Sequence, residues 1–154
     1  MSQLVVVSGN PRPGSRTSAL AIAVGSALGP PEPLVIEVGA LGAGLLTPGD
    51  PATEAALAAI RGAELLVVAT PTYKGSYTGV LKVLLDQLPA QALAGKRAVP
   101  VVTAGVAPQA AAAEALLRQL LTELGATVEA GLPVVESELP ETTAIAAKYA
   151  AALA

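Results

Sequence analysis

The chain of 154 residues contains no cysteine and no histidine. Without cysteine it can form no disulfide, no thiolate nucleophile and no sulfur-ligated metal site. Without histidine it has no imidazole base, no serine–histidine triad and no histidine metal ligand. Many hydrolase mechanisms are thereby excluded. What remains is the chemistry of carboxylates and lysines, or a cofactor that carries the reaction while the protein positions it.

Aromatic and charged residues are also scarce. Phe and Trp are absent, aromatic residues make up 2% of the chain and charged residues 14%, whereas hydrophobic residues reach 53%. The core must therefore consist of Ala, Val and Leu. The length fits one domain with a sizeable core, so we expect a single domain over residues 1–154.

The high hydropathy raises the question of a membrane protein. Mean hydropathy is +0.60, but the long uncharged stretch 98–113 contains Pro100, Gly105 and Pro108 and is too short to span a bilayer. The first residues lack the basic and apolar regions of a secretory signal, so a cytoplasmic location is expected. A net charge of −3 argues against a general nucleic-acid surface.

Short apolar runs alternate with longer helical patterns along the chain. The runs predict strands over residues 4–7, 34–38, 65–69, 99–102 and 128–135. The helical patterns predict helices over residues 16–28, 51–61, 78–88, 110–124 and 143–153. Five strands alternating with five helices predict an α/β fold, a doubly wound parallel sheet with helices on both faces.

Ligands of such a sheet bind outside the carboxyl ends of its strands, where the strand order reverses. This directs attention to three loops, residues 9–15, 71–77 and 103–109. The first loop combines glycines, hydroxyls and two arginines at the start of a helix, where free N–H groups and partial positive charge attract an anion. Its pattern is neither that of a dinucleotide fold nor that of a P-loop. Taken alone, it fits a phosphate site and a well-capped solvated turn equally.

The second loop holds two of the three tyrosines. Lys74 lies between Tyr73 and Tyr77, and Gly75 allows a ligand to approach the backbone closely. A planar ring could lie against such a loop. In isolation, however, an ordinary turn whose tyrosines cover the edge of the sheet is the better interpretation.

Taken together, the two loops resemble the pattern of the NADPH-dependent FMN reductase family. The matching segments are residues 8–18 and residues 71–82, with Asp86. They are most similar to the branch of flavin reductases that supply reduced flavin to alkanesulfonate-type monooxygenases, whose members show a Gly-Ser-Pro-Arg loop and a Pro-x-Tyr-Lys segment. The resemblance covers nearly the whole chain in the order of its elements and is specific in these two loops.

The resemblance implies a flavodoxin-like fold with the strand order 2-1-3-4-5. It also implies a function, the reduction of FMN by NADPH or NADH through hydride transfer to flavin N5, with reduced flavin passed to a monooxygenase. The cofactor carries this reaction, so no catalytic side chain and no metal ligand are expected. The missing cysteine and histidine agree with this expectation.

The resemblance further implies which residues bind the cofactor. Around the FMN phosphate it places Arg12, Ser15, Arg16 and Ser18, with Gly9, Asn10 and Thr17 of the same loop. Along the ribityl chain and the ring it places Pro71, Thr72, Tyr73, Lys74, Gly75 and Ser76. The third flavin loop corresponds to Thr103, Ala104 and Gly105. Lys82 and Asp86 match the family pattern, but their spacing on a helix favours a structural or interfacial role.

Two departures from the family pattern stand out. Asn10 occupies a position where this branch usually has Ser, and residues 106–109 replace a Gly-Gly-Ser run followed by His. Three other functions therefore remain open: an enzyme that retains FMN and reduces a quinone, an azo dye or a metal ion; a flavodoxin-type electron carrier; and a structural module. The two arginines and the few aromatic residues argue against the carrier.

A homodimer, or a tetramer built from dimers, is the expected assembly. The predicted helix 78–88 has more apolar positions than one face of a sheet needs, namely Val80, Leu81, Val83, Leu84, Leu85 and Leu88. A second subunit on this surface could complete the ring pocket that one small chain cannot enclose. The family resemblance implies the same assembly.

Overall fold

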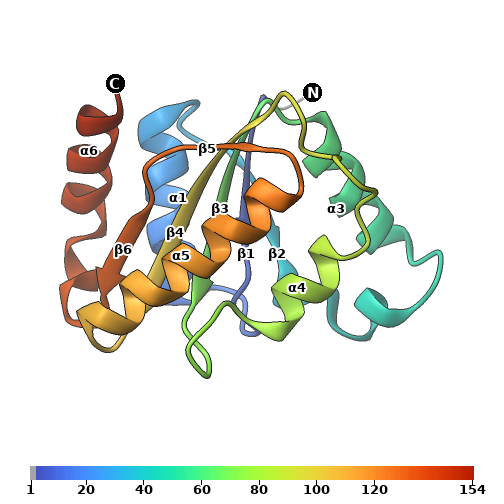
Figure 1. Ribbon diagram of the computed structural model, residues 1–154, viewed down its shortest axis with the longest axis horizontal. Helices are drawn as coiled ribbons and strands as arrows, with labels where there is room; N and C mark the ends of the chain where they lie inside the picture. The colour runs from blue at the N-terminus through green and yellow to red at the C-terminus, as the bar shows by residue number, and fades with distance from the viewer. Residues whose placement is uncertain (1–2) are drawn as a thin grey trace.

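A parallel sheet in the order β2-β1-β3-β4-β5 forms the middle layer of the computed structural model, which describes residues 3–154 (Figure 1). The strands are β1 (Leu4–Ser8), β2 (Leu34–Glu37), β3 (Leu65–Pro71), β4 (Arg97–Ala104), β5 (Thr127–Val128) and β6 (Leu132–Val135). All of the pairings are parallel. The predicted flavodoxin-like strand order 2-1-3-4-5 is confirmed.

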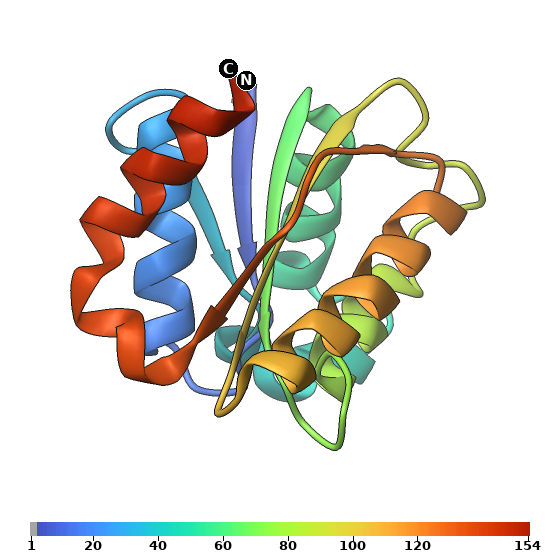
Figure 2. The same ribbon diagram turned by 60° about the vertical axis from the view of Figure 1, so that its left-hand side comes forward.

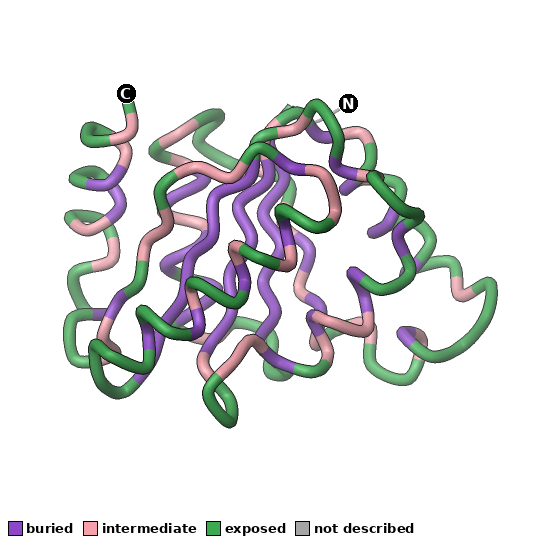
Figure 3. Tube along the Cα trace, viewed as in Figure 1, coloured by how far each residue is buried: buried purple, intermediate pink, exposed green. Residues whose placement is uncertain are grey.

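Helices cover both faces of this sheet (Figure 2). They are α1 (Arg16–Leu28), α2 (Val38–Leu41), α3 (Pro51–Gly62), α4 (Gly79–Leu85), α5 (Ala107–Glu123) and α6 (Thr142–Leu153), with the 3-10 helices η1 (Gly42–Leu46) and η2 (Glu136–Glu141). One core cluster joins the sheet to α3, α4 and α5, and the other joins it to α1 and α6. Figure 3 shows the central strands buried along nearly their whole length.

The residues at which the helices begin are explained by N-cap hydrogen bonds and by proline in the first turn. α1 has the predicted bounds, and its N-cap Ser15 accepts a hydrogen bond from the Ser18 N–H group. α3 begins as predicted after Asp50, whose carboxylate accepts from the N–H and hydroxyl groups of Thr53 at 3.0 and 2.8 Å. α5 begins at Ala107, three residues earlier than predicted, because Pro108 is tolerated in the first turn of a helix.

The predicted strand 128–135 is wrong as a single element. It consists of β5 and β6, which pair with the two ends of the same edge of β4. Between them, Gly131 packs so closely against the Glu114 side chain that an added Cβ would lie 2.1 Å from its Oε1 atom. The predicted strand 34–38 is also one residue too long, because the chain turns into α2 at Val38.

The helix that suggested a dimer buries its leucines within the single chain. Leu81 and Leu84 are fully buried, Leu85 and Leu88 nearly so, and Val80 and Val83 pack partly against the core. α2 and η1 contact α4 and so cover part of its apolar surface. The leucine argument for a second subunit is therefore wrong, although the dimer itself stays a prediction.

The sequence predicted that the long uncharged stretch is too short to span a bilayer, and the helices of residues 3–154 bear on this prediction. In this part of the chain, no helix combines the length and the apolar character needed to cross a membrane. The expectation about a secretory signal depends in part on Met1 and Ser2, which lie outside the described residues.

Tyr149 provides a test of the packing between α6 and the sheet. Its side chain is 9% exposed, its hydroxyl donates to the Ala130 carbonyl, and burial, aided by Glu129, raises its pKa from 10.0 to about 12. A raised pKa means that the neutral side chain stabilises the fold below about pH 10 and that this contribution is lost as the pH rises towards 12. Tyr149→Phe should therefore flatten the fall of Tm across this range, measured by circular dichroism.

The matched control is Tyr73→Phe, which removes the hydroxyl of a side chain that is 46% exposed. This variant should follow the pH profile of the unmodified protein. Parallel Tm profiles for Tyr149→Phe and the unmodified protein would show that Tyr149 does not govern alkaline stability.

Candidate functional site

The three loops singled out from the sequence meet at one edge of the sheet. β1, β3 and β4 are neighbours and run in parallel, so their carboxyl ends lie side by side. Figure 2 shows the loops after these strands at the lower edge of the sheet, with the loop after β3 projecting furthest. This edge includes the place where the strand order reverses, between β1 and β3.

The loop after β1 presents donors and positive charge at the start of α1. The Asn10 side chain accepts a hydrogen bond from the Arg12 N–H group at 2.9 Å, which closes a local turn. Gly14 has a φ of 70°, a conformation that glycine adopts without steric cost. The side chains of Arg12 and Arg16 are exposed, and neither forms an ion pair within residues 3–154.

The donors of this loop already hold an anion, the carboxylate of Glu37 at the end of β2. The Gly14 N–H group donates to one carboxylate oxygen at 2.8 Å, and the Ser18 hydroxyl donates to the other at 2.7 Å. Because the proton of Ser18 goes to Glu37, the Ser8 hydroxyl, 2.6 Å away, donates to Ser18. Glu37 was not predicted from the sequence, although the strand order 2-1-3-4-5 puts the end of β2 beside this loop.

Thr17 and Thr103 lie inside the fold. Both are buried, and their hydroxyl oxygens are 2.8 Å apart, so each satisfies the other. The carbonyl of Thr103 also accepts a hydrogen bond from the Thr72 hydroxyl at 2.9 Å. These bonds tie the start of α1 and the loop after β3 to the end of β4, which makes both threonines positioning residues.

Gly9 and Thr78 connect the first and second loops. The Thr78 hydroxyl donates to the Gly9 carbonyl at 2.6 Å and accepts from the Leu81 N–H group at the start of α4. An added Cβ at Gly9 would lie 2.9 Å from the Cβ of Leu81, so α4 can approach β1 this closely only with glycine there. Thr78 is a second residue to which sequence analysis gave no role.

The tip of the loop after β3 is a tight hairpin. Tyr73 and Ser76 exchange two backbone hydrogen bonds, at 2.9 and 3.2 Å. Lys74 and Gly75 between them have φ values of 54° and 82°, as a two-residue hairpin turn requires. For a residue with a Cβ this conformation costs roughly 1 kcal/mol. The turn holds Tyr73 and Lys74 outward, exposed to solvent.

The remaining predicted residues differ in their exposure. Pro71 and Ala104 are buried at the ends of β3 and β4, whereas Gly105 is exposed. Of the segment that departs from the family pattern, Val106 is 51% exposed and the rest belongs to the first turn of α5. Tyr77 packs partly against the core, unlike Tyr73.

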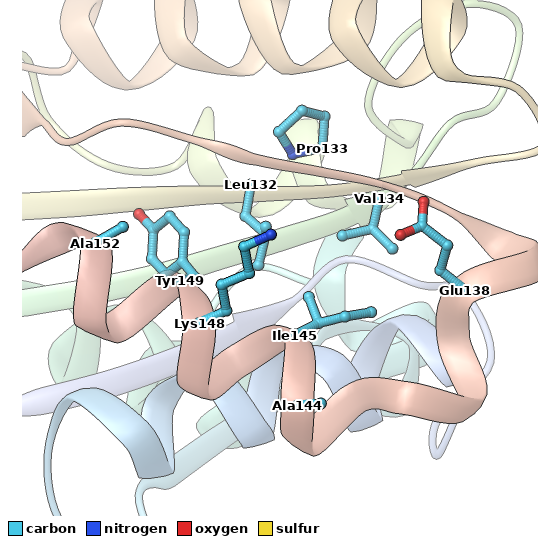
Figure 4. Close-up of a pocket in the computed structure, with 9 residues that line it drawn as sticks. All are labelled: Leu132, Pro133, Val134, Glu138, Ala144, Ile145, Lys148, Tyr149 and Ala152. Atoms are coloured by element: carbon cyan, nitrogen blue, oxygen red, sulfur yellow. The ribbon is translucent and has the colours of Figure 1, made fainter.

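A separate hollow of about 420 Å³ lies between β6 and α6 (Figure 4). Its walls are mainly apolar, with the charged side chains Glu138 and Lys148 among them. It lacks the concentration of N–H and hydroxyl donors found at the start of α1. Within residues 3–154 no cluster of Asp or Glu could hold a metal ion. The loop edge is therefore the stronger candidate site.

The fold and this edge define a class of protein: a flavodoxin-like α/β protein in which a loop rich in hydrogen-bond donors lies where the strand order reverses. Residues 2–138 match the family described as NADPH-dependent FMN reductase. The chain therefore belongs to the NADPH-dependent FMN reductase family, as its resemblance predicted.

Individual relatives agree with this assignment. The chain is 45% identical over 64 residues to an FMN reductase (NADPH) of Escherichia coli strain K12, an alignment that covers 42% of this chain and 34% of that protein. It is 35% identical to the NADH-dependent FMN reductase SfnF of Pseudomonas fluorescens strain Pf0-1, over 90% of this chain and 79% of that protein. The first two curated relatives are matched over about a third of their length.

A solved structure extends the comparison to the fold. The apo form of an NADH:FMN oxidoreductase, EMOB, superposes with a TM-score of 0.80 and is 31% identical, covering 100% of this chain and 91% of that one. The similarity thus includes all of the elements that carry the three loops.

Gly39 in α2 should control the position of the loop after β1. An added Cβ there would lie 2.1 Å from the Pro11 carbonyl oxygen, which belongs to that loop. We expect Gly39→Ala to push the loop outwards and to weaken the FMN binding that the family resemblance predicts there about tenfold or more, since a displacement of a binding loop near 1 Å is costly. Flavin fluorescence quenching measures the Kd.

Gly79→Ala is the matched control, because a Cβ at Gly79 has no neighbour within 4 Å. The same Kd for Gly39→Ala and for the unmodified protein would mean that the loop does not depend on Gly39 for its position.

Proposed function

We propose that this protein binds FMN at the loop edge and catalyses its reduction by NADPH or NADH. The single observation that carries the proposal is the set of anion donors at the start of α1, in a chain that belongs to the NADPH-dependent FMN reductase family. The relatives matched over most of their length include FMN reductases described as NADH-dependent and as NADPH-dependent. The family therefore leaves the nicotinamide open.

The residues present fit the phosphate of FMN. Gly14 and Ser18 already donate to a carboxylate, so their geometry suits an anion. The N–H groups of Arg16 and Thr17 face out of the same helix end, because the first residues of a helix have no intrahelical acceptor. The exposed guanidinium groups of Arg12 and Arg16 add charge-assisted donors suited to phosphate oxygens.

We assign the ring and the ribityl chain to the second and third loops. In this proposal the segment from Pro71 to Ser76 lies along the flavin, with the exposed Tyr73 side chain and the Lys74 ammonium group at the hairpin tip. Gly105 leaves room for a ligand beside the end of β4, since an added Cβ there would meet no atom within 4 Å.

The chain's part in the reaction is binding and orientation. When bound, FMN supplies the ring that accepts a hydride from the reduced nicotinamide, so the protein needs no acid or base of its own. Thr103 and Thr78 hold the three loops in fixed relation through buried hydrogen bonds. A fixed relation between the loops lowers the entropic cost of bringing two rings together.

The physiological acceptor of the electrons is a second part of the proposal. We propose that reduced FMN passes to a flavin-dependent monooxygenase in the cytoplasm. The loop sequences support this, because they are most similar to the branch of reductases that serve alkanesulfonate-type monooxygenases.

Steady-state turnover tests the proposed function. Loss of nicotinamide absorbance should require added FMN after the protein has been desalted, with either NADPH or NADH preferred. A yellow protein that needs a quinone for turnover would instead indicate an enzyme that retains FMN. No oxidation of either nicotinamide with FMN or with a quinone would contradict a reductase function.

Arg16→Ala should weaken FMN binding about tenfold, because a charge-assisted hydrogen bond at an exposed site contributes about 1.5 kcal/mol. Riboflavin lacks the phosphate, so its Kd should not change. Arg61→Ala, which removes an exposed arginine at the far end of α3, is the control for loss of charge. If Arg16→Ala weakened FMN and riboflavin binding equally, the assignment of the FMN phosphate to this loop would be wrong.

We propose that the protein forms a homodimer or a tetramer. Leu46 is 78% exposed and lines a hollow together with Leu45, Pro48 and Val83, next to Thr47, Asp86 and Gln87, so a partly apolar surface extends from η1 towards α4. A second copy packed there would cover this surface. Light scattering with and without FMN should give at least twice the chain mass of 15.1 kDa. A monomer mass in both samples would contradict the assembly.

A further inference from the structure

Glu37 occupies the donors that an FMN phosphate would need. Its two carboxylate oxygens accept hydrogen bonds from the Gly14 N–H group and the Ser18 hydroxyl, at 2.8 and 2.7 Å. The residue comes from β2, not from the loop itself, and its side chain is partly buried. The contact therefore joins two separate segments at one anion-binding point.

The positive charges nearby do not neutralise this carboxylate through direct contact. Neither Arg12 nor Arg16 forms an ion pair with Glu37, or with any other acidic group of residues 3–154. Glu37 is instead held by two neutral donors. Because a carboxylate and a phosphate are both anions, they cannot share the same two donors without strong repulsion.

We propose that Glu37 is an affinity-determining residue that acts as an internal competitor of the FMN phosphate. This inference rests on the proposed function, in that FMN binds with its phosphate at the start of α1. The phosphate must displace the Glu37 carboxylate from Gly14 and Ser18. Glu37 thus weakens the binding of FMN. When FMN leaves, the carboxylate again accepts hydrogen bonds from Gly14 and Ser18.

The competition predicts a selective effect. Riboflavin has no phosphate and does not need the two donors, so its affinity does not depend on Glu37. FMN affinity does, because every binding event breaks two charge-assisted hydrogen bonds of the carboxylate. Glu37 therefore narrows the preference of the site for FMN over riboflavin and keeps FMN exchangeable.

Fluorescence titration of both flavins tests the proposal with the full chain. The variants are Glu37→Gln, which removes the charge and keeps the size of the side chain, and Glu37→Ala, which removes both oxygens. Glu32→Gln is the matched control, because Glu32 is exposed five residues earlier, ahead of β2. A circular dichroism melt of each variant shows whether it is folded.

We expect Glu37→Gln and Glu37→Ala to lower the Kd of FMN about tenfold and to leave that of riboflavin unchanged. Glu32→Gln should change neither. The proposal that Glu37 competes with the FMN phosphate would be wrong if folded Glu37 variants bound FMN with unchanged or weaker affinity. It would also be wrong if their affinity for riboflavin rose as much as their affinity for FMN.

The unmodified protein separates this inference from the proposed function. If it binds FMN more tightly than riboflavin while the Glu37 variants show no gain, the phosphate site stands and only the role of Glu37 is lost. If the unmodified protein and both variants bind the two flavins equally or not at all, the phosphate site and the role of Glu37 are both overturned.

Discussion

Buried hydroxyl groups at the carboxyl ends of the strands hold the candidate site together. The buried polar residues are Ser8, Asn10, Thr17, Ser18, Thr53, Thr70, Thr78 and Thr103, and all of them except Thr53 lie at or beside this edge of the sheet. A buried hydroxyl without a partner costs about 1 to 3 kcal/mol. Within residues 3–154 each buried side-chain oxygen or nitrogen has a partner. The loops therefore cannot shift independently without breaking bonds inside the fold.

The lack of large aromatic side chains explains why glycine contacts matter so much here. Small side chains let α4 approach β1 at Gly9 and let α2 approach the loop after β1 at Gly39. At both places an added Cβ would come within 3 Å of a neighbouring atom. Close contacts at these two glycines thus help to set the shape of the loop edge from within the fold, while side chains such as Arg12, Arg16 and Tyr73 stay exposed to solvent.

Sequence patterns predicted the features that depend on neighbouring residues in the chain. The bounds of α1 and the start of α3 belong to this group, whereas the strand order was implied by the family resemblance. Contacts between distant segments were not predictable in this way. The division between β5 and β6 depends on Gly131 packing against Glu114, and the burial of the α4 leucines depends on the folding of α2 and η1 over them. Glu37 was missed for the same reason, since its partners lie 23 and 19 residues away.

Exposed arginines and the Glu37 carboxylate lie at the same loop after β1, and in the proposed site they act on a phosphate in opposite ways. Arg12 and Arg16 stand in solvent, where they can attract a phosphate through a field that salt screens over about 10 Å. Of the two donors that hold Glu37, Ser18 is buried and Gly14 is exposed, and a hydrogen bond to an anion is strongest at a buried donor such as Ser18. In the proposed site the arginines favour the bound phosphate, and competition from Glu37 for the Gly14 and Ser18 donors lowers the net affinity for FMN. Under the proposed function, in which reduced flavin passes to another enzyme, binding and release of flavin both matter, and opposing contributions to them come from different residues.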